Sequence, residues 1–324
     1  MDMTVFPYTK GLHDLGNGAW AYLQPDGSWG WSNAGLIVDG EETLLIDTLF
    51  DFKTTAEMLA EMRAAAPKAE VIDTLVNTHS NGDHTFGNKL ACAGEIVSSR
   101  VCADEMAERG PDKIAELMRN AHNLGEGGKF LYEAMGPAKF DFEEVDDYVL
   151  PTRTFEKELT LRVGDKEVRL INVGPAHTGG DVLVHVPGDR TVFTGDILFN
   201  EGHPVIWEGP IENWVNACDM MLDWDLETVV PGHGAVCGKL AIRRMKEYLL
   251  YINTEARKRY EAGMDIEEAA LDISMADFDG WFDAERIVIN LHTLYGEYAG
   301  RRSTFDRIKL FGMMAKYAKS RSAV

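Results

Sequence analysis

Residues 77–88 read NTHSNGDHTFGN and follow directly on the apolar run VIDTLV. This segment concentrates side chains that bind metals, because His79 lies four residues before Asp83 and His84 follows at once. A tight loop with these spacings can point His79 toward one ion and the Asp83–His84 pair toward a second. Gly82 permits such a turn. We therefore predict a loop of metal ligands at the end of a strand.

The same pattern, a strand followed at once by an ionisable residue, recurs along the chain. LLID ends in Asp47, INVGPAH in His177, FTGD in Asp196 and VVPGH in His233. In α/β proteins, ligand sites assemble at the carboxyl ends of strands. Imidazole and carboxylate are ligands that suit zinc, iron or manganese. Each residue alone also fits a capping, turn or surface role, but their joint occurrence predicts a metal site.

Sequence periodicity predicts strands and helices that alternate as far as Gly238. The segment GLIVDGEETLLIDT, residues 35–48, is typical of a hairpin, because two β-rich runs flank a polar turn. The segment DFKTTAEMLAEMRAAAP predicts a helix that Asp51 or Thr54 caps and Pro67 ends. Further strands are expected within residues 71–77, 159–173, 182–187, 191–199 and 228–234.

Two parts of the chain are expected to be mainly helical. Residues 101–145 have a charged helical periodicity that glycines interrupt, which indicates a helical insertion able to act as a lid. Later helices are expected at residues 240–263, 266–274 and 284–300. We therefore divide the chain into a domain of residues 1–238, which carries the motifs, and a helical C-terminal region of residues 239–324 packed on it.

Charge and composition restrict the partners that this protein can have. The chain has 324 residues, of which 32 are basic and 53 acidic, and its net charge is -21. This charge repels phosphate backbones and anionic lipids, so we expect a small-molecule substrate rather than nucleic acid or a membrane. The first residues lack the pattern of a secretory signal, and the cysteines are too scattered for a zinc or redox motif. We expect a protein of the cytoplasm with reduced thiols.

The order LLID, THSNGDH, GPAHTGGD, FTGD and PGHG resembles the five sequence motifs of the metallo-β-lactamase fold hydrolases, over roughly residues 18–238. The resemblance implies an α/β protein, a four-layer αβ/βα sandwich with the metal site at its edge, here with a helical insertion and an all-helical C-terminal extension. It also implies a ligand set for two ions: His79 and His177 for the first, Asp83, His84 and His233 for the second, and Asp196 as a bridge.

The same resemblance implies roles beyond coordination. Asp47 would accept hydrogen bonds that orient the ligand loop. A metal-bound hydroxide would attack the substrate, because the ions lower the pKa of water. Asp83 would act as the catalytic residue that positions or deprotonates this water.

Asn81 departs from the pattern of the family, HxHxDH, because it stands where the second histidine is expected. An amide oxygen is a weaker zinc ligand than imidazole, so the first site should be weak. Three outcomes follow: a dinuclear zinc centre with one weak ion, a mononuclear centre at the second site, or a harder ion such as manganese or iron. Alternatively, Asn81 only bonds a coordinated water and two ions bind regardless.

Residues outside the motifs are candidates for contact with substrate. His203 follows Asp196 by seven positions, in a loop beside a proline, and can touch substrate or replace the missing ligand. Trp29, Trp31 and Trp207 lie in loops near the motifs and can line an apolar pocket.

The sequence favours a metal-dependent hydrolase that attacks a small ester, lactone, amide or thioester. An alternative is a redox enzyme or lyase of the same superfamily with a single metal ion, and another is a non-catalytic binding protein. The C-terminal helices can cover the sandwich, form a pocket wall or form a homodimer interface, and an exposed face bearing Leu249, Leu250, Tyr251 and Ile252 would favour association.

Overall fold

The computed structural model describes residues 7–301, 304 and 306–322. In this part of the chain the strands form two sheets of seven and five strands. The seven-stranded sheet runs in chain order: β1 (Gly11–Gly16), β2 (Ala19–Leu23), β3 (Ala34–Asp39), β4 (Glu42–Ile46), β5 (Thr74–Val76), β6 (Glu95–Ser99) and β7 (Arg153–Phe155). Strands β1 to β4 pair antiparallel and β4 to β7 pair parallel.

The five-stranded sheet has the order β12-β11-β10-β9-β8. Its strands are β8 (Glu158–Val163), β9 (Lys166–Asn172), β10 (Val182–Val186), β11 (Thr191–Phe193) and β12 (Thr228–Val230). Only the β11–β12 pair among these described strands is parallel, and the others are antiparallel. Both parallel regions end at the side of the sandwich where the motif residues lie.

The two sheets face each other across a core of aliphatic side chains. Leu44 and Val76 of the first sheet belong to one buried cluster with Val184 and Phe193 of the second. Gly35 permits this close packing, because a Cβ atom there would lie 2.3 Å from the Phe193 ring. The sheets therefore meet directly, with no helix between them.

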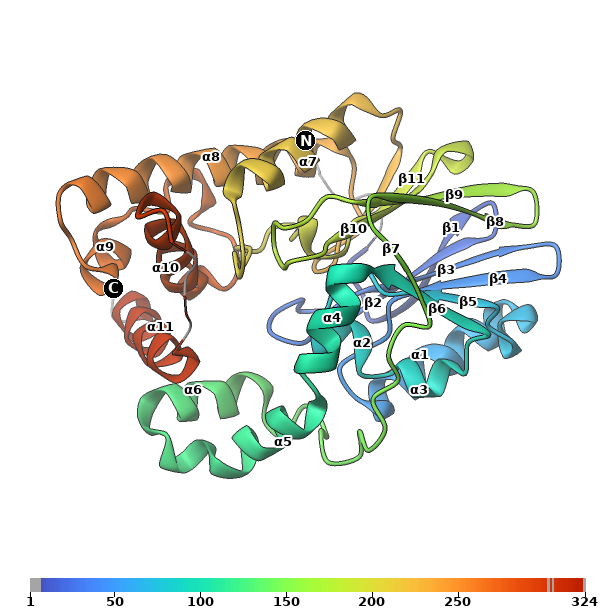
Figure 1. The fold of residues 1–324 in the computed structure, drawn as a ribbon, viewed down its shortest axis with the longest axis horizontal. Coiled ribbons are helices and arrows are strands. Elements are labelled where there is room, and N and C mark those ends of the chain that lie inside the picture. Colours follow the sequence, from blue (N-terminus) through green and yellow to red (C-terminus); the bar gives the residue numbers. More distant parts are fainter. Residues whose placement is uncertain (1–6, 302–303, 305, 323–324) are drawn as a thin grey trace.

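Helices cover the outer face of each sheet, which completes the predicted four-layer αβ/βα sandwich (Figure 1). Helix α1 (Phe52–Ala65) packs Met58 and Met62 against the first sheet, and α7 (Ile211–Asp223) and α8 (Lys239–Glu261) cover the second. The predicted cap of α1 is confirmed, since the Asp51 carboxylate accepts a hydrogen bond from the Thr54 N–H at 2.8 Å. The predicted hairpin is confirmed as the antiparallel β3–β4 pair.

The segment expected to be a helical insertion forms α4 (Arg100–Glu108), α5 (Pro111–Asn120) and α6 (Gly125–Met135). The C-terminal region forms α8, α9 (Ile266–Asp272), α10 (Ile287–Tyr298) and α11 (Arg307–Ser322). Figure 1 shows α11 lying against α6, far from it in sequence. Gly127 of α6 makes this contact close, because a Cβ atom there would lie 2.0 Å from the Ile308 carbonyl oxygen.

Most apolar side chains of helix α8 are buried inside the molecule. Leu249 and Ile252 are fully buried, whereas Leu250 is 47% exposed. Helix α8 thus has isolated exposed apolar residues rather than the continuous apolar face that we expected. This surface therefore gives no support for a homodimer. None of the described helices is both long and apolar enough to cross a bilayer.

Candidate metal centre and pocket

The motif residues meet at one edge of the sandwich because each follows a strand that ends there. The stretch after β5 continues into the short helix α2 (Gly82–Thr85), the stretch after β9 forms a loop, β11 leads into the 3-10 helix η4 (Gly195–Ile197), and β12 is followed by the PGHG turn. These segments carry His79, Asp83, His84, His177, Asp196 and His233. None of the six is more than 9% exposed.

Two overlapping groups of these side chains have the geometry to hold metal ions. One consists of His79, His84 and Asp196, and the other of Asp83, His84 and His233, with ligand atoms within 4.8 Å of one another in each group. His177 belongs to neither group, although its Nε2 atom lies 3.3 Å from Asp196 Oδ2. His84 belongs to both groups, and together the two groups support a binuclear metal site.

Asp196 lies among all four histidines. Its carboxylate oxygens lie 3.1 Å from His84 Nε2, 3.5 Å from His233 Nε2 and 3.8 Å from His79 Nε2. Burial alone raises the pKa of Asp196, but the charges of His233 and the other histidines outweigh it and hold the pKa well below its usual value. Asp196 is thus an anion at neutral pH, the form in which a carboxylate binds a metal ion.

The atoms at the centre test whether metal ions fit here. His79 Nε2, His84 Nε2 and Asp196 Oδ1 are buried and find no hydrogen-bond partner among the described residues, although two of them lie 3.1 Å apart. Buried polar atoms without partners are costly, and bound cations would satisfy them. Nitrogen and oxygen ligands are those of zinc, iron or manganese. The residues present therefore fit metal binding.

The second ring nitrogen of each histidine is anchored, which leaves Nε2 facing the centre. The partners of Nδ1 are Thr78 Oγ1 for His79 (3.0 Å), Asp47 Oδ2 for His84 (2.9 Å), the Val205 carbonyl for His177 (2.6 Å) and the carbonyls of Gly27 and Trp31 for His233 (3.0 and 3.1 Å). Because a carbonyl only accepts, Nδ1 carries the proton in His177 and His233. In each neutral ring the lone pair then lies on Nε2, the atom that faces the metal centre.

Asp47 and Asp181 accept hydrogen bonds from the two loops that carry His79 and His177. Asp47 accepts hydrogen bonds from the N–H and hydroxyl of Thr78, both at 2.7 Å, in addition to that from His84. Asp181 accepts from the N–H of Thr178 at 3.0 Å and from its hydroxyl at 2.6 Å, next to His177. Sequence reasoning missed Asp181, although it closes the motif GPAHTGGD and lies four residues after a candidate ligand.

Asn81 contacts the metal centre through a hydrogen bond. Its Nδ2 atom lies 2.9 Å from His177 Nε2, and it donates because His177 Nδ1 already donates to Val205. The amide thus occupies the lone pair that would otherwise bind a metal ion. His177, which lies outside the two ligand groups, is thus the histidine that Asn81 contacts.

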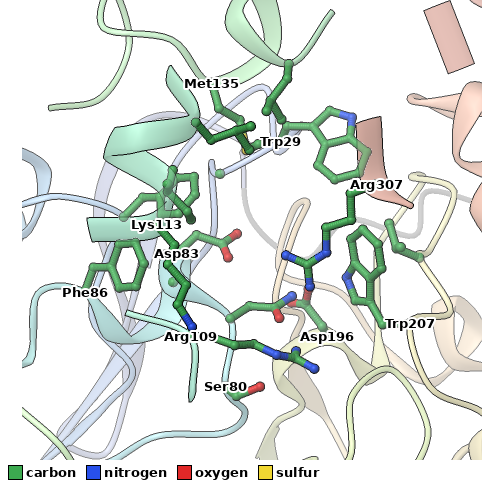
Figure 2. Close-up of a pocket in the computed structure, with 18 of the residues that line it drawn as sticks. Trp29, Ser80, Asp83, Phe86, Arg109, Lys113, Met135, Asp196, Trp207 and Arg307 are labelled. Carbon is green, nitrogen blue, oxygen red and sulfur yellow. The ribbon is translucent and has the colours of Figure 1, made fainter. Parts of the chain in front are cut away.

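A cavity of about 370 Å³ opens over the metal centre (Figure 2). Its floor includes Asn81, Asp83, His177, Asp196 and His233. Apolar side chains form much of the wall, among them Trp29, Phe50, Phe86, Leu117, Met135, Trp207 and Phe311. The insertion and α11 contribute to this wall together with the sandwich, so the cavity lies between all three parts of the chain.

Two of the four residues predicted to contact substrate do line this cavity, namely Trp29 and Trp207. Trp31 is not among the described residues that line it, and its ring packs against Phe140 with the centroids 4.6 Å apart. The expectation for His203 is corrected. Its ring is fully buried and packs against the rings of Tyr248 and Trp281, and its Nε2 forms a hydrogen bond with the Phe278 carbonyl oxygen at 3.1 Å.

Comparison with known proteins adds to this geometry. The family model described as the metallo-beta-lactamase superfamily matches residues 27–233. The alpha subunit of 2,4-dinitroanisole O-demethylase from Nocardioides sp. (strain JS1661) is 25% identical over 299 residues, which make up 87% of this chain and 74% of that subunit. Hydroxyacylglutathione hydrolase from Maricaulis maris (strain MCS10) is 30% identical over 112 residues, or 33% of this chain and 43% of that enzyme.

Solved structures share the fold. The inverting sec-alkylsulfatase Pisa1 from Pseudomonas sp. matches with a TM-score of 0.66 at 15% identity, covering 90% of this chain and 50% of the alkylsulfatase. A metallo-beta-lactamase from Pontibacter korlensis matches with a TM-score of 0.56 at 17% identity, covering 75% of this chain and 99% of that protein. This chain thus spans half the length of the alkylsulfatase, and at these identities the likeness concerns the fold alone.

Proposed function

This chain belongs to the metallo-beta-lactamase superfamily, and on that premise we propose that it is a metal-dependent hydrolase of a small ester, lactone, amide or thioester. The observation that carries the proposal is the convergence of buried histidine Nε2 atoms and carboxylates on the floor of a largely apolar cavity. Bound metal ions would supply Lewis acidity and an activated water there. We propose zinc, with iron or manganese as alternatives, and a location in the cytoplasm.

The residues of the chain would divide the remaining tasks. Asp83 faces the cavity, and its Oδ2 atom lies 3.4 Å from His233 Nε2, so it is placed to orient a water and accept its proton. Trp29 and Trp207 would hold the apolar part of the substrate and exclude bulk water.

A second candidate reaction is the hydrolytic removal of a methyl group from an aryl ether. Its support is the relative named as an O-demethylase subunit, which aligns with 87% of this chain. An aromatic ring fits a cavity whose wall includes Trp29, Phe50 and Trp207. Both candidates place the reacting bond over the same metal centre.

The test is a substrate screen on zinc-loaded protein with p-nitrophenyl esters, a lactone, a thioester and 2,4-dinitroanisole. We expect hydrolysis that disappears with a chelator, returns with added metal, and is lost in an Asp83→Ala, His84→Ala double variant. His122→Ala is the matched control, because His122 lies in the insertion and does not line the cavity. Full activity of the double variant, or turnover that persists without metal, would disprove a metal-dependent reaction.

A further inference from the structure

Cationic side chains gather in the cavity of a strongly acidic protein. The net charge is -21, yet Arg109, Lys113 and Arg307 line the wall that the insertion and α11 provide. Figure 2 shows their charged ends directed into the cavity, on the side that also holds Ser80 and Asp196. A cavity lined with positive charge attracts anions, even in a protein whose net charge is negative.

Two of these cations are positioned from different parts of the chain. Arg109 ends α4, and Glu105 lies 3.7 Å from its guanidinium while accepting a hydrogen bond from Ser80 in the metal loop at 2.6 Å. Arg307 begins α11, and its guanidinium lies 5.5 Å from the centroid of the Trp207 ring. The cluster therefore depends on the packing of the insertion against α11.

These charges are only partly neutralised by the protein. Within residues 7–301, 304 and 306–322, no carboxylate forms an ion pair with Arg307 or Lys113, and Lys113 donates to the backbone carbonyl of Glu108. Desolvation, together with the positive charge of Arg109, lowers the pKa of Arg307, and the negative charge of Glu105 only partly opposes this effect. Like charges held close together are unfavourable until an anion lies between them.

A fourth cation of the cavity serves as an internal contrast. Arg286 is 2% exposed, pairs with Asp283 at 2.9 Å and donates to the His203 carbonyl at 2.9 Å. Asp283 balances its charge, although its buried Nε finds no hydrogen-bond partner among the described residues, and its guanidinium lies over the Trp29 ring. Arg307 and Lys113 have no such carboxylate partner among the described residues, and Arg109 has only Glu105 at 3.7 Å, which leaves donors of all three available to a ligand.

We propose that Arg109, Lys113 and Arg307 bind an oxyanion of the substrate while the apolar wall holds its hydrophobic body, so that the substrate is an amphiphilic organic anion. This inference deepens the proposed hydrolase function and rests on it. Guanidinium groups bind carboxylate, sulfate and phosphate through paired hydrogen bonds, and lysine adds a point charge. The cavity of about 370 Å³ is within the range of small-molecule sites.

Binding of a matched pair of probes tests the proposal. Naphthalene-2-sulfonate and naphthalene-2-sulfonamide share an aromatic body and differ in charge, and calorimetric titration into the zinc-loaded full chain gives both affinities. We expect the sulfonate to bind more tightly, and Arg109→Gln and Arg307→Gln each to weaken it by roughly tenfold without affecting the sulfonamide. Circular dichroism and thermal unfolding verify that the variants fold.

Two control variants separate local contacts from net charge. Arg119→Gln removes a charge from α5 and Lys316→Gln one from α11, and both residues lie outside the cavity, where they pair with Glu143 and Glu267. Equal loss of sulfonate affinity in controls and cavity variants overturns the proposal. It is likewise overturned if affinity is unchanged in the cavity variants but lost on removal of the metal, because the ions would then hold the anion.

Hydrolysis of two further compounds locates the oxyanion within the substrate. Turnover of 2-naphthyl sulfate places it in the group that is cleaved, whereas turnover of mono-2-naphthyl glutarate in preference to 2-naphthyl butyrate places it away from the scissile bond. Sulfonate binding as expected in a protein without hydrolytic activity would support the anion site and refute the proposed function. If the protein hydrolyses neutral esters but binds naphthalene-2-sulfonate no more tightly than naphthalene-2-sulfonamide, the anion site is refuted and the proposed function is not.

Discussion

Replacing Asn81 with histidine should tighten the binding of one metal ion. In the structure the Asn81 amide donates a hydrogen bond to His177 Nε2 at 2.9 Å, and thus covers a lone pair that faces the metal centre. A metal ion can use His177 only after this hydrogen bond is broken. Asn81→His removes the competing donor and adds an imidazole ligand at the same position.

The magnitude follows from the hydrogen bond and the ligand. A hydrogen bond of this kind contributes about 1 kcal/mol, which weakens the binding of an ion that needs His177 by a factor of roughly five. Groups that support a metal site change its affinity by about tenfold to a hundredfold. We therefore expect the affinity of the weaker site to rise by about tenfold to a hundredfold in Asn81→His.

Elemental analysis after dialysis against a modest chelator concentration measures the outcome, and competition with a chromogenic chelator gives the affinity. The wild-type protein should lose one of two equivalents of zinc, and Asn81→His should retain both. Asn81→Ala is the deciding control, because it should leave the affinity equal or raise it about fivefold if the amide competes with the metal. Two tightly held ions in the wild type, no change in Asn81→His, or weaker binding in Asn81→Ala would refute this reasoning.

Three further predictions concern residues behind the site. Asp47→Ala should lower metal affinity about tenfold to a hundredfold in the same chelator competition, since His84 loses the partner of its Nδ1 atom. Asp181→Ala leaves the N–H and hydroxyl of Thr178 without their acceptor, and should lower the free energy of unfolding in urea by about 2–3 kcal/mol. Burial, with a smaller effect of a nearby arginine, lowers the pKa of His203 to about 3. In the unfolded chain the histidine has a pKa of about 6.5, so below this pH it binds a proton that folded His203 does not bind. The free energy of unfolding, which is highest above pH ~6.5, should therefore fall by about 2 kcal/mol at pH ~5. Urea unfolding at both pH values should show this loss in the wild type and a smaller one in His203→Gln; equal losses would count against it.

Local signals predicted much of the sandwich. The hairpin at residues 35–48 and the cap at Asp51 were readable because alternation and capping act within a few residues. The β1–β2 hairpin was missed, although Asn17-Gly18 at its turn is a signal of the same kind. Helix α11 was not singled out within the helical C-terminal region, because its amphipathic pattern is weak.

The candidate ligands were found because histidine and aspartate at strand ends have few other uses, whereas the wall of the cavity depends on long-range packing. Arg109 and Arg307 lie almost two hundred positions apart, and charged residues on helices usually indicate a solvated face. For His203 the prediction failed in the opposite way, because a residue expected at the site lies away from it. It is near Asp196 in sequence, but its N–H bonds the Phe282 carbonyl, and the chain there turns into the helical region.

The residues of the metal centre and those of the cavity wall are translated at different times, because α11 comes late in the chain. All six candidate ligands lie within residues 79–233, so a nascent chain can complete the metal centre before the ribosome has translated α11. Arg307 and Phe311 join the cavity wall only afterwards. The candidate ligands can thus meet while the site is still open, and the side chains that we propose to select the substrate complete the wall later, when α11 docks.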